Sequence, residues 1–273
     1  MNRPLIKKIR PCTFEPNCQG WESIAGKWRT VGWPRRPNAS ELSKMVPIVE
    51  STNGYPVGIF GATPELRDLS AKCKPKNEVF LFEKSEISYH AMTDILKKDF
   101  KASPKKEFLV HIDWELLDFE KNSFSLLMGD IMTGYMQTVP RLERFLYNCY
   151  QMLQVGGKFI LRDFVNTPFN ASIKEIRHSK LSTDEKRWAY ILKPNFAIEG
   201  KTFYEEKLAQ NLLKAGDVKV FKTCANPPRD RLMPDQKDFE ALVAKSKFNV
   251  SIICPPQCNG KASPGLWVLE KKG

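Results

Sequence analysis

The stretch from Val57 to Leu66 constrains the fold more than any other part of the sequence. It predicts a short buried strand over 57–60, a tight turn at Gly61 and a helix that begins at Pro64. Thr63 is placed to cap this helix, and proline suits the first helical turn because its missing N–H is not needed there. Such a unit leaves backbone N–H groups at the mouth of a sheet, where a ligand can bind.

The glycine turn lacks the G-x-G-x-x-G pattern of dinucleotide-binding proteins. That pattern needs three glycines to bring the backbone against a pyrophosphate. Here Gly61 stands at the turn and Gly58 lies within the strand. We therefore expect a ligand without a pyrophosphate. The alternative is that the turn only connects a strand to a helix.

Strand and helix patterns alternate along the middle of the chain. Further strand patterns lie at 78–83, 107–112, 124–128 and 159–161, and further helical patterns at 85–98 and 139–153, the second ended by the glycines of 154–157. The alternation predicts an α/β fold with a parallel sheet and right-handed crossovers. Two final strand patterns, 248–254 and 266–271, predict an antiparallel hairpin at the sheet edge. We expect a Rossmann-like three-layer sandwich around a mostly parallel seven-stranded sheet.

The remaining segments suggest an N-terminal arm and an insertion. Residues 1–50 are predicted to form an arm or lid, and 51–273 the main domain with a partly helical insertion at about 165–246. The insertion is expected to hold helices at 183–193, 203–215 and 235–246 and a strand at 218–221. The arm contains Trp21, Trp28, Trp33 and the Pro34–Pro37 run, followed by a helix from about Glu41 that ends before Pro47. The tryptophans either pin the arm to the domain or close it over a ligand.

Polar or small residues follow four of the predicted strands. Glu83 lies 22 positions after Gly61, where a carboxylate at the second strand tip can accept hydrogen bonds from both ribose hydroxyls. Asp113 and Trp114 follow the third strand, where an acid can bind an adenine amino group and an aromatic ring can cover the base. Gly129 and Asp130 end the fourth strand. Since ligands bind at the carboxyl ends of parallel strands, these tips predict one nucleoside site.

Composition indicates a basic protein with free thiols. The chain has 273 residues, seven scattered cysteines and a formal net charge of +12. An odd number of scattered cysteines is typical of a reducing compartment, so we expect a cytoplasmic protein. Neither Cys12 with Cys18 nor Cys254 with Cys258 has the spacing of a zinc ribbon, and we expect no metal site. The dispersed lysines are interpreted as solvated surface, and no segment is apolar enough to span a membrane.

The order of these motifs resembles the class I S-adenosylmethionine-dependent methyltransferases. The resemblance rests on G-A-T-P-E-L at 61–66, the acid at Glu83, D-W at 113–114, L-L-M-G-D at 126–130 and V-G-G-K-F-I-L-R-D-F at 155–164. A bacterial subgroup with a tryptophan-rich, R-P-containing arm is especially similar. The resemblance covers about 28–165. Glu83 stands where many members have aspartate, and Val155 where proline is usual.

The resemblance implies a set of roles around S-adenosyl-L-methionine. The backbone from Gly61 through Ala62 to Thr63 would contact its methionine portion, and Gly129 and Asp130 would line the methyl side. The other roles would be ribose binding by Glu83 with Lys84 beside it, adenine binding by Asp113 and Trp114, and closure of the arm by Trp28 and Arg36.

Methyl transfer from a sulfonium depends mainly on holding the nucleophile in line and dry, and a base is needed only for a protonated acceptor. Candidate bases are Asp130, Tyr135 and Asp163; for Asp163 the alternative is an ion pair with Arg162 or another cation. We expect a small-molecule acceptor and a monomer or homodimer. RNA, DNA or protein methylation remains the alternative that the charge suggests, although residues 226–229 lack the aromatic of an N/D-P-P-Y/F loop. A non-catalytic binding module is the third alternative.

Overall fold

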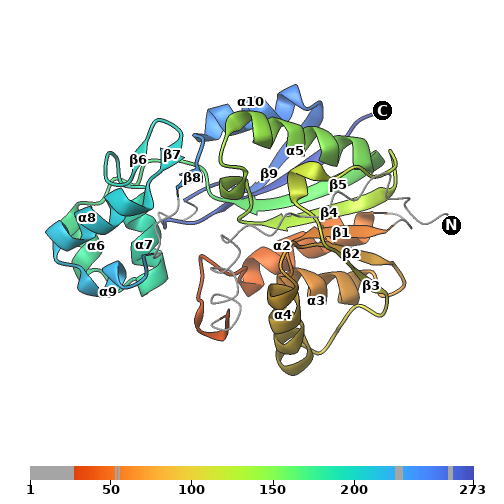
Figure 1. The fold of residues 1–273 in the computed structure, drawn as a ribbon, viewed down its shortest axis with the longest axis horizontal. Coiled ribbons are helices and arrows are strands. Elements are labelled where there is room, and N and C mark those ends of the chain that lie inside the picture. The colour runs from red at the N-terminus through yellow and green to blue at the C-terminus, as the bar shows by residue number, and fades with distance from the viewer. Residues whose placement is uncertain (1–27, 53, 55, 225–229, 258–260) are drawn as a thin grey trace.

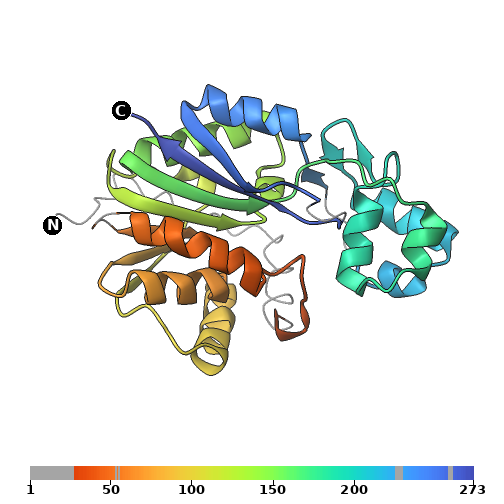
Figure 2. The same ribbon diagram turned by 180° about the vertical axis from the view of Figure 1, so that it is seen from behind.

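A seven-stranded sheet forms the centre of the molecule in the computed structural model, which describes residues 28–52, 54, 56–224, 230–257 and 261–273 (Figures 1 and 2). Its strand order is β3-β2-β1-β4-β5-β10-β9. The strands are β1 (Val57–Phe60), β2 (Val79–Phe82), β3 (Glu107–Val110), β4 (Phe124–Asp130), β5 (Leu153–Asp163), β9 (Phe248–Cys254) and β10 (Gly265–Lys271). The first five pair in parallel, and β10 pairs antiparallel with both β5 and β9. The predicted Rossmann-like sandwich with an antiparallel edge hairpin is confirmed.

Some residues that the sequence analysis discussed lie outside the described part of the chain. They are Trp21, Cys12, Cys18, Cys258 and 226–229.

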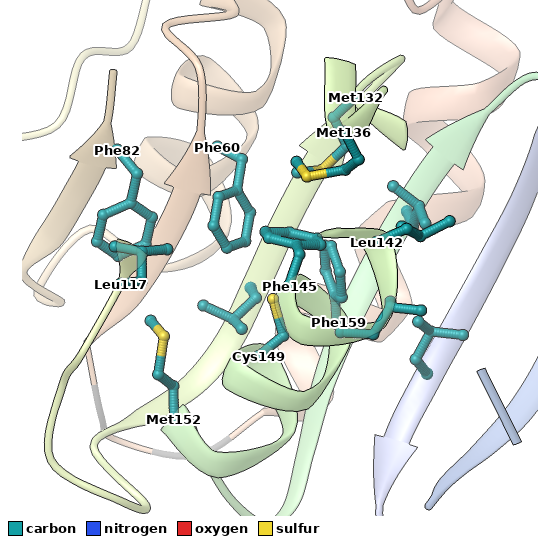
Figure 3. Close-up of a cluster of buried hydrophobic side chains, with 14 of the residues drawn as sticks. Phe60, Phe82, Leu117, Met132, Met136, Leu142, Phe145, Cys149, Met152 and Phe159 are labelled. Atoms are coloured by element: carbon teal, nitrogen blue, oxygen red, sulfur yellow. The ribbon is translucent and has the colours of Figure 1, made fainter. Parts of the chain in front are cut away.

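Helices cover both faces of this sheet (Figure 1). One face carries α2 (Ala39–Ser51), α3 (Pro64–Cys73) and α4 (Glu86–Asp99), and the other carries α5 (Val139–Met152) and α10 (Gln236–Lys245). Beneath α5, aromatic and sulfur-containing side chains fill the core, with Phe145 4.9 Å from Phe60 and 6.1 Å from Phe159 between ring centroids (Figure 3). Burial of this much apolar surface fixes the strand tips relative to one another.

Helix α2 begins inside the segment predicted to be an arm and packs on the sheet. Asn38 caps it in a capping box with Glu41. The expectation that this helix ends before Pro47 is wrong, because the helix continues to Ser51 with Pro47 inside it. The proline lies on the exposed side, where the carbonyl that lacks an N–H partner can reach water, while Met45 and Val49 are fully buried on the sheet.

The expected glycine end of α5 is also wrong. This helix ends at Met152, and β5 starts directly at Leu153 and runs through both glycines. Gly156 has φ +74°, and the pairing of β4 with β5 shifts register between Phe124 and Leu126. The glycines thus belong to an irregular strand start rather than to a helix cap.

The insertion forms a separate lobe beside the sheet (Figures 1 and 2). It contains α6 (Ile173–His178), α7 (Thr183–Ile191), α8 (Glu205–Ala215), α9 (Val218–Phe221), and a small sheet of β6 (Ile198–Glu199), β7 (Thr202–Phe203) and β8 (Arg231–Leu232). The lobe has its own apolar core, which includes Trp188, Phe203 and Leu208. By contrast, α10, which was predicted as part of the insertion, packs on the main sheet through Phe239 and Val243.

The strand predicted at 218–221 is wrong, since these residues form the short helix α9. Their β-branched and aromatic side chains favour a strand locally. However, Gly216 ends α8 with φ +69°, and the carboxylate of Asp217 accepts a hydrogen bond from the N–H of Val220 at 3.2 Å. This capping bond starts a new helical turn and outweighs the local preference.

Candidate functional site

A cavity of about 470 Å³ lies at the carboxyl ends of β1 to β4. Four of the predicted strand-tip features line it: Gly61, Glu83, the Asp113–Trp114 pair, and Asp130. Its volume falls within the range of small-molecule sites, roughly 300–1,000 Å³. The other predicted residues that line it are Trp28, Ala62, Thr63, Lys84 and Tyr135. Three predicted residues do not line it, namely Gly129, Arg36 and Asp163.

The turn after β1 needs a glycine. Gly61 has φ +82° and donates a hydrogen bond from its N–H to the carbonyl of Phe82 at 2.9 Å. A Cβ at this position would lie 3.8 Å from Cζ2 of Trp114 and 3.9 Å from Oε2 of Glu83. The turn therefore keeps the space between these two side chains open. Thr63 occupies the N-cap position of α3, but its side chain makes no capping hydrogen bond.

Glu83 places a partly buried carboxylate at the tip of β2. Its Oε1 accepts a hydrogen bond from the N–H of Ser85 at 2.9 Å. Burial raises the pKa of Glu83 to about 7, although the N–H groups of Ser85 and Lys84 and the charge of Lys84 oppose this shift. The ammonium of Lys84 lies 3.8 Å from the carboxylate of Asp113, so the tips of β2 and β3 are joined by an ion pair.

Trp114 forms a fixed aromatic wall. Its indole Nε1 donates to the carbonyl of Phe82 at 2.5 Å. The ring meets Phe60 edge-on at 6.1 Å and Tyr135 edge-on at 6.2 Å between centroids. A planar ring held by a hydrogen bond and two aromatic contacts is suited to pack against a flat ligand group.

Arg162 joins the tip of β4 to the N-terminal arm. This fully buried side chain lies 2.6 Å from the carboxylate of Asp130 and 3.0 Å from that of Glu41. It also donates from Nη2 to the carbonyl of Pro34 at 2.6 Å. Burial raises the pKa of Asp130 to about 7, with Arg162 opposing the shift. Asp130 is thus held in place by a buried cation.

Arg36 acts on the cavity through Trp28. Its guanidinium pairs with Glu65 at the start of α3, with a shortest N–O distance of 2.5 Å. It also lies 5.6 Å from the ring centroid of Trp28, donates to the Trp28 carbonyl at 3.2 Å, and so fixes a buried tryptophan that lines the cavity. The arm reaches the lobe as well, because Arg35 pairs with Asp184 of α7 at 3.0 Å.

Asp163 lies below the cavity wall rather than in it. Its carboxylate accepts hydrogen bonds from the N–H groups of Met132, Thr133 and Phe164 at 2.6–2.8 Å. Burial raises its pKa to about 6, and these backbone donors oppose the shift. The carboxylate thereby holds the start of the short helix η4 (Thr133–Met136), which carries Tyr135 into the cavity wall. The alternative ion pair with Arg162 does not form, since Arg162 pairs with Asp130 and Glu41.

Sequence reasoning found Tyr135 but missed the other polar residues that η4, the start of α5 and the lobe supply to the cavity. These residues are Gln137, Arg141, Thr202, Asp230 and Arg231, and the start of α4 adds the unpredicted Ser85 and Ser88. Arg231 reaches the cavity because β8 returns from the lobe and packs against η4, where a Cβ on Gly134 would lie 3.4 Å from the Cβ of Arg231. No local sequence pattern indicates this contact, because it depends on how the lobe folds back.

Comparison with known proteins bears on the fold. No protein-family profile matches the chain, and no curated protein is similar to it in sequence. An S-adenosylmethionine-dependent methyltransferase from Methanosarcina mazei superposes with a TM-score of 0.52 at 13% identity, over 83% of this chain and 97% of that one. A putative methyltransferase of the same class from Listeria monocytogenes has a TM-score of 0.55 at 14% identity, over 92% and 99% of the two chains. This chain shares its Rossmann-like fold with these two proteins.

A protein of a different described activity also shares the fold. A putative Zn-dependent alcohol dehydrogenase from Rhodobacter sphaeroides has a TM-score of 0.58 at 14% identity, over 96% of this chain and all of that one. Within the described residues, no group of three or more His, Cys, Asp or Glu side chains could hold a metal ion. No helix in that part of the chain is long and apolar enough to cross a membrane. At these identities the similarity concerns the fold, so any function must be argued from the cavity itself.

Proposed function

We propose that this protein is an S-adenosylmethionine-dependent methyltransferase that acts on a small-molecule acceptor. One observation carries the proposal. Gly61, Glu83, Asp113–Trp114 and Asp130 line a single cavity at the carboxyl ends of adjacent parallel strands. This is where open α/β sheets bind their ligands. The fold is shared with two proteins described as S-adenosylmethionine-dependent methyltransferases, which supports this assignment.

Each part of the cofactor has a group on the cavity wall that suits it. Glu83 offers a carboxylate to the ribose hydroxyls, and Trp114 offers a fixed flat surface to the adenine beside Asp113. The left-handed turn at Gly61 keeps backbone close to the cavity without a Cβ, which suits the methionine portion beside Ala62 and Thr63. Gly129 acts indirectly in this proposal, since a Cβ there would clash with the sulfur of Met132 in the packed core.

When bound, the cofactor would supply an activated methyl group, and an acceptor that carries an O–H or N–H would have to lose its proton. The chain's own contribution is to hold the two molecules in line and to exclude water. Asp130 and Tyr135 are the two candidate proton acceptors on the cavity wall. Asp163 is proposed as a positioning residue, because three backbone N–H groups already engage its carboxylate.

The charge of the cavity favours a small acceptor over a nucleic acid. The chain as a whole is basic, but the lining carries four acids, Glu83, Asp113, Asp130 and Asp230, against the three cations Lys84, Arg141 and Arg231. A polyanion gains little from such a surface. Binding to mixed RNA is therefore expected to be weak and to fall steeply with salt. RNA binding that survives moderate salt would favour a macromolecular substrate instead.

Calorimetry with S-adenosylhomocysteine tests the proposal. We expect the wild-type chain to bind this product, and Glu83→Ala to weaken binding by about ten- to hundredfold, because hydrogen bonds to a charged acceptor are worth roughly 1.5–3 kcal/mol. Glu86→Ala is the matched control, since Glu86 is an exposed acid three positions away at the start of α4. Equal affinities for wild type and Glu83→Ala would remove Glu83 from the site, and no binding by the wild type would remove the function.

A further inference from the structure

Arg231 differs from the other two cations that line the cavity, because no carboxylate among the described residues forms an ion pair with it. Lys84 pairs with Asp113 at 3.8 Å, and Arg141 forms a two-point ion pair with Glu115. Within the described residues, no carboxylate lies at ion-pair distance from Arg231, and its Nε is buried without a hydrogen-bond partner. Leaving a buried charged donor without an acceptor is unfavourable, so this arrangement indicates that a ligand supplies the acceptor.

The structure holds the Arg231 side chain in a defined place. Its backbone pairs with Phe203 in the small sheet of the lobe, and its stem packs on Gly134 of η4, with Cδ 3.5 Å from where a Cβ on that glycine would be. The guanidinium carbon lies 5.0 Å from the ring centroid of Tyr135. Stacking on an aromatic face orients the planar fork of N–H groups and leaves its edge for an anion.

The lobe and η4, rather than the strand tips, supply this corner of the cavity. Arg231 and Thr202 come from β8 and β7, while Tyr135 and Met136 come from η4. The adenosyl-binding features proposed above come instead from the ends of β1, β2 and β3. The corner therefore offers one guanidinium and apolar ring and thioether surface, separate from the groups assigned to the cofactor.

We propose that Arg231 binds the anionic group of the methyl acceptor, and that the acceptor is a small organic acid whose carboxylate pairs with this guanidinium while its apolar body packs on Tyr135 and Met136. The inference rests on the proposed function and names its substrate class. A carboxylate is favoured over a phosphate because the cavity lining carries four acids and only one cation, Arg231, that no described carboxylate pairs, which matches one negative charge rather than two. Arg231 is a binding residue in this account and takes no part in the transfer of the methyl group.

The test compares matched acids and amides on the full chain saturated with S-adenosylhomocysteine. The probes are benzoate and octanoate, their neutral counterparts benzamide and octanamide, and phenyl phosphate. Calorimetry should show the wild type binding at least one acid about tenfold or more tighter than its amide, as expected for a charged pair. Arg231→Gln should abolish this preference, and Arg231→Lys should retain part of it, because an ammonium keeps the charge but not the fork.

Two controls separate this inference from the proposed function. Arg144→Gln removes an exposed arginine of α5 that does not line the cavity, and it should leave the acid preference unchanged. Arg231→Gln should keep the wild-type affinity for S-adenosylhomocysteine, measured without probe, and a wild-type thermal melt. The inference is overturned if the wild type shows no preference for an acid over its amide, or if Arg231→Gln keeps that preference. It is also overturned if phenyl phosphate binds more tightly than either acid, or if Arg231→Gln loses affinity for S-adenosylhomocysteine. Failure of the wild type to bind S-adenosylhomocysteine overturns the proposed function instead.

Discussion

The raised pKa of Glu83 predicts that adenosyl binding depends on pH. Burial brings this pKa to about 7 in the free protein, and ribose hydroxyls donate best to the ionised carboxylate. When only the ionised form binds, the apparent dissociation constant is the intrinsic one divided by the ionised fraction. That fraction is about one in eleven at pH 6 and about nine-tenths at pH 8, so affinity should fall about tenfold as the pH drops from 8 to 6.

The assay is calorimetry with 5′-methylthioadenosine at pH 6, 7 and 8. This ligand retains the adenosyl group but lacks the amino acid portion, so its own charge does not change across the range. In Glu83→Gln the side chain no longer titrates, so the affinity of this variant should be nearly the same at pH 6 and pH 8. At pH 8 it should be about tenfold or more weaker than that of the wild type. Equal wild-type affinities at pH 6 and pH 8, or a pH dependence in Glu83→Gln as large as that of the wild type, would refute the assignment of this carboxylate to the ribose.

The remaining predictions concern the turn, the arm and stability. Gly61→Ala and Gly156→Ala both place a Cβ at positive φ, so each should lower stability by about 1–2 kcal/mol, but only Gly61→Ala should weaken S-adenosylhomocysteine binding, because only its Cβ enters the cavity. Arg162→Met should lower the free energy of unfolding by about 3–5 kcal/mol in urea titrations, since it leaves two buried carboxylates without their cation, whereas Arg144→Met should change it little. Glu83 has a folded pKa of about 7, above the roughly 4.3 expected when unfolded, so the folded chain binds more protons between these values. Wild-type stability should therefore fall relative to Glu83→Gln as the pH rises from 5 to 7; a constant difference between their melting temperatures would contradict this.

The sequence predicted the sheet and the strand-tip residues because both depend on local patterns. Apolar runs bounded by glycine and acids mark the strands, and parallel strands bring their carboxyl ends to one edge. Glu83 and Trp114 could thus be placed in one cavity although 31 positions separate them in the chain. The errors arose where a contact outweighed a local preference, as when Asp217 capped a helix at residues that favour a strand.

The corner around Arg231 could not be predicted for a different reason. Its position depends on the lobe folding back so that β8 pairs with β7 and packs on η4. The buried role of Arg162 was equally hidden, because its partners Glu41 and Asp130 are brought together only in three dimensions. Motif reasoning therefore found the groups proposed to hold the cofactor but not those proposed to select the acceptor.

A crystal structure of the full chain with S-adenosylhomocysteine tests the central claim most directly. We predict that the adenosyl group lies in the cavity at the ends of β1 to β4, with both ribose hydroxyls within hydrogen-bond distance of Glu83 and the adenine against Trp114. The homocysteine sulfur should face the space beside Tyr135. A ligand bound elsewhere on the chain, or an adenosyl group in this cavity that makes no contact with Glu83, would contradict the account.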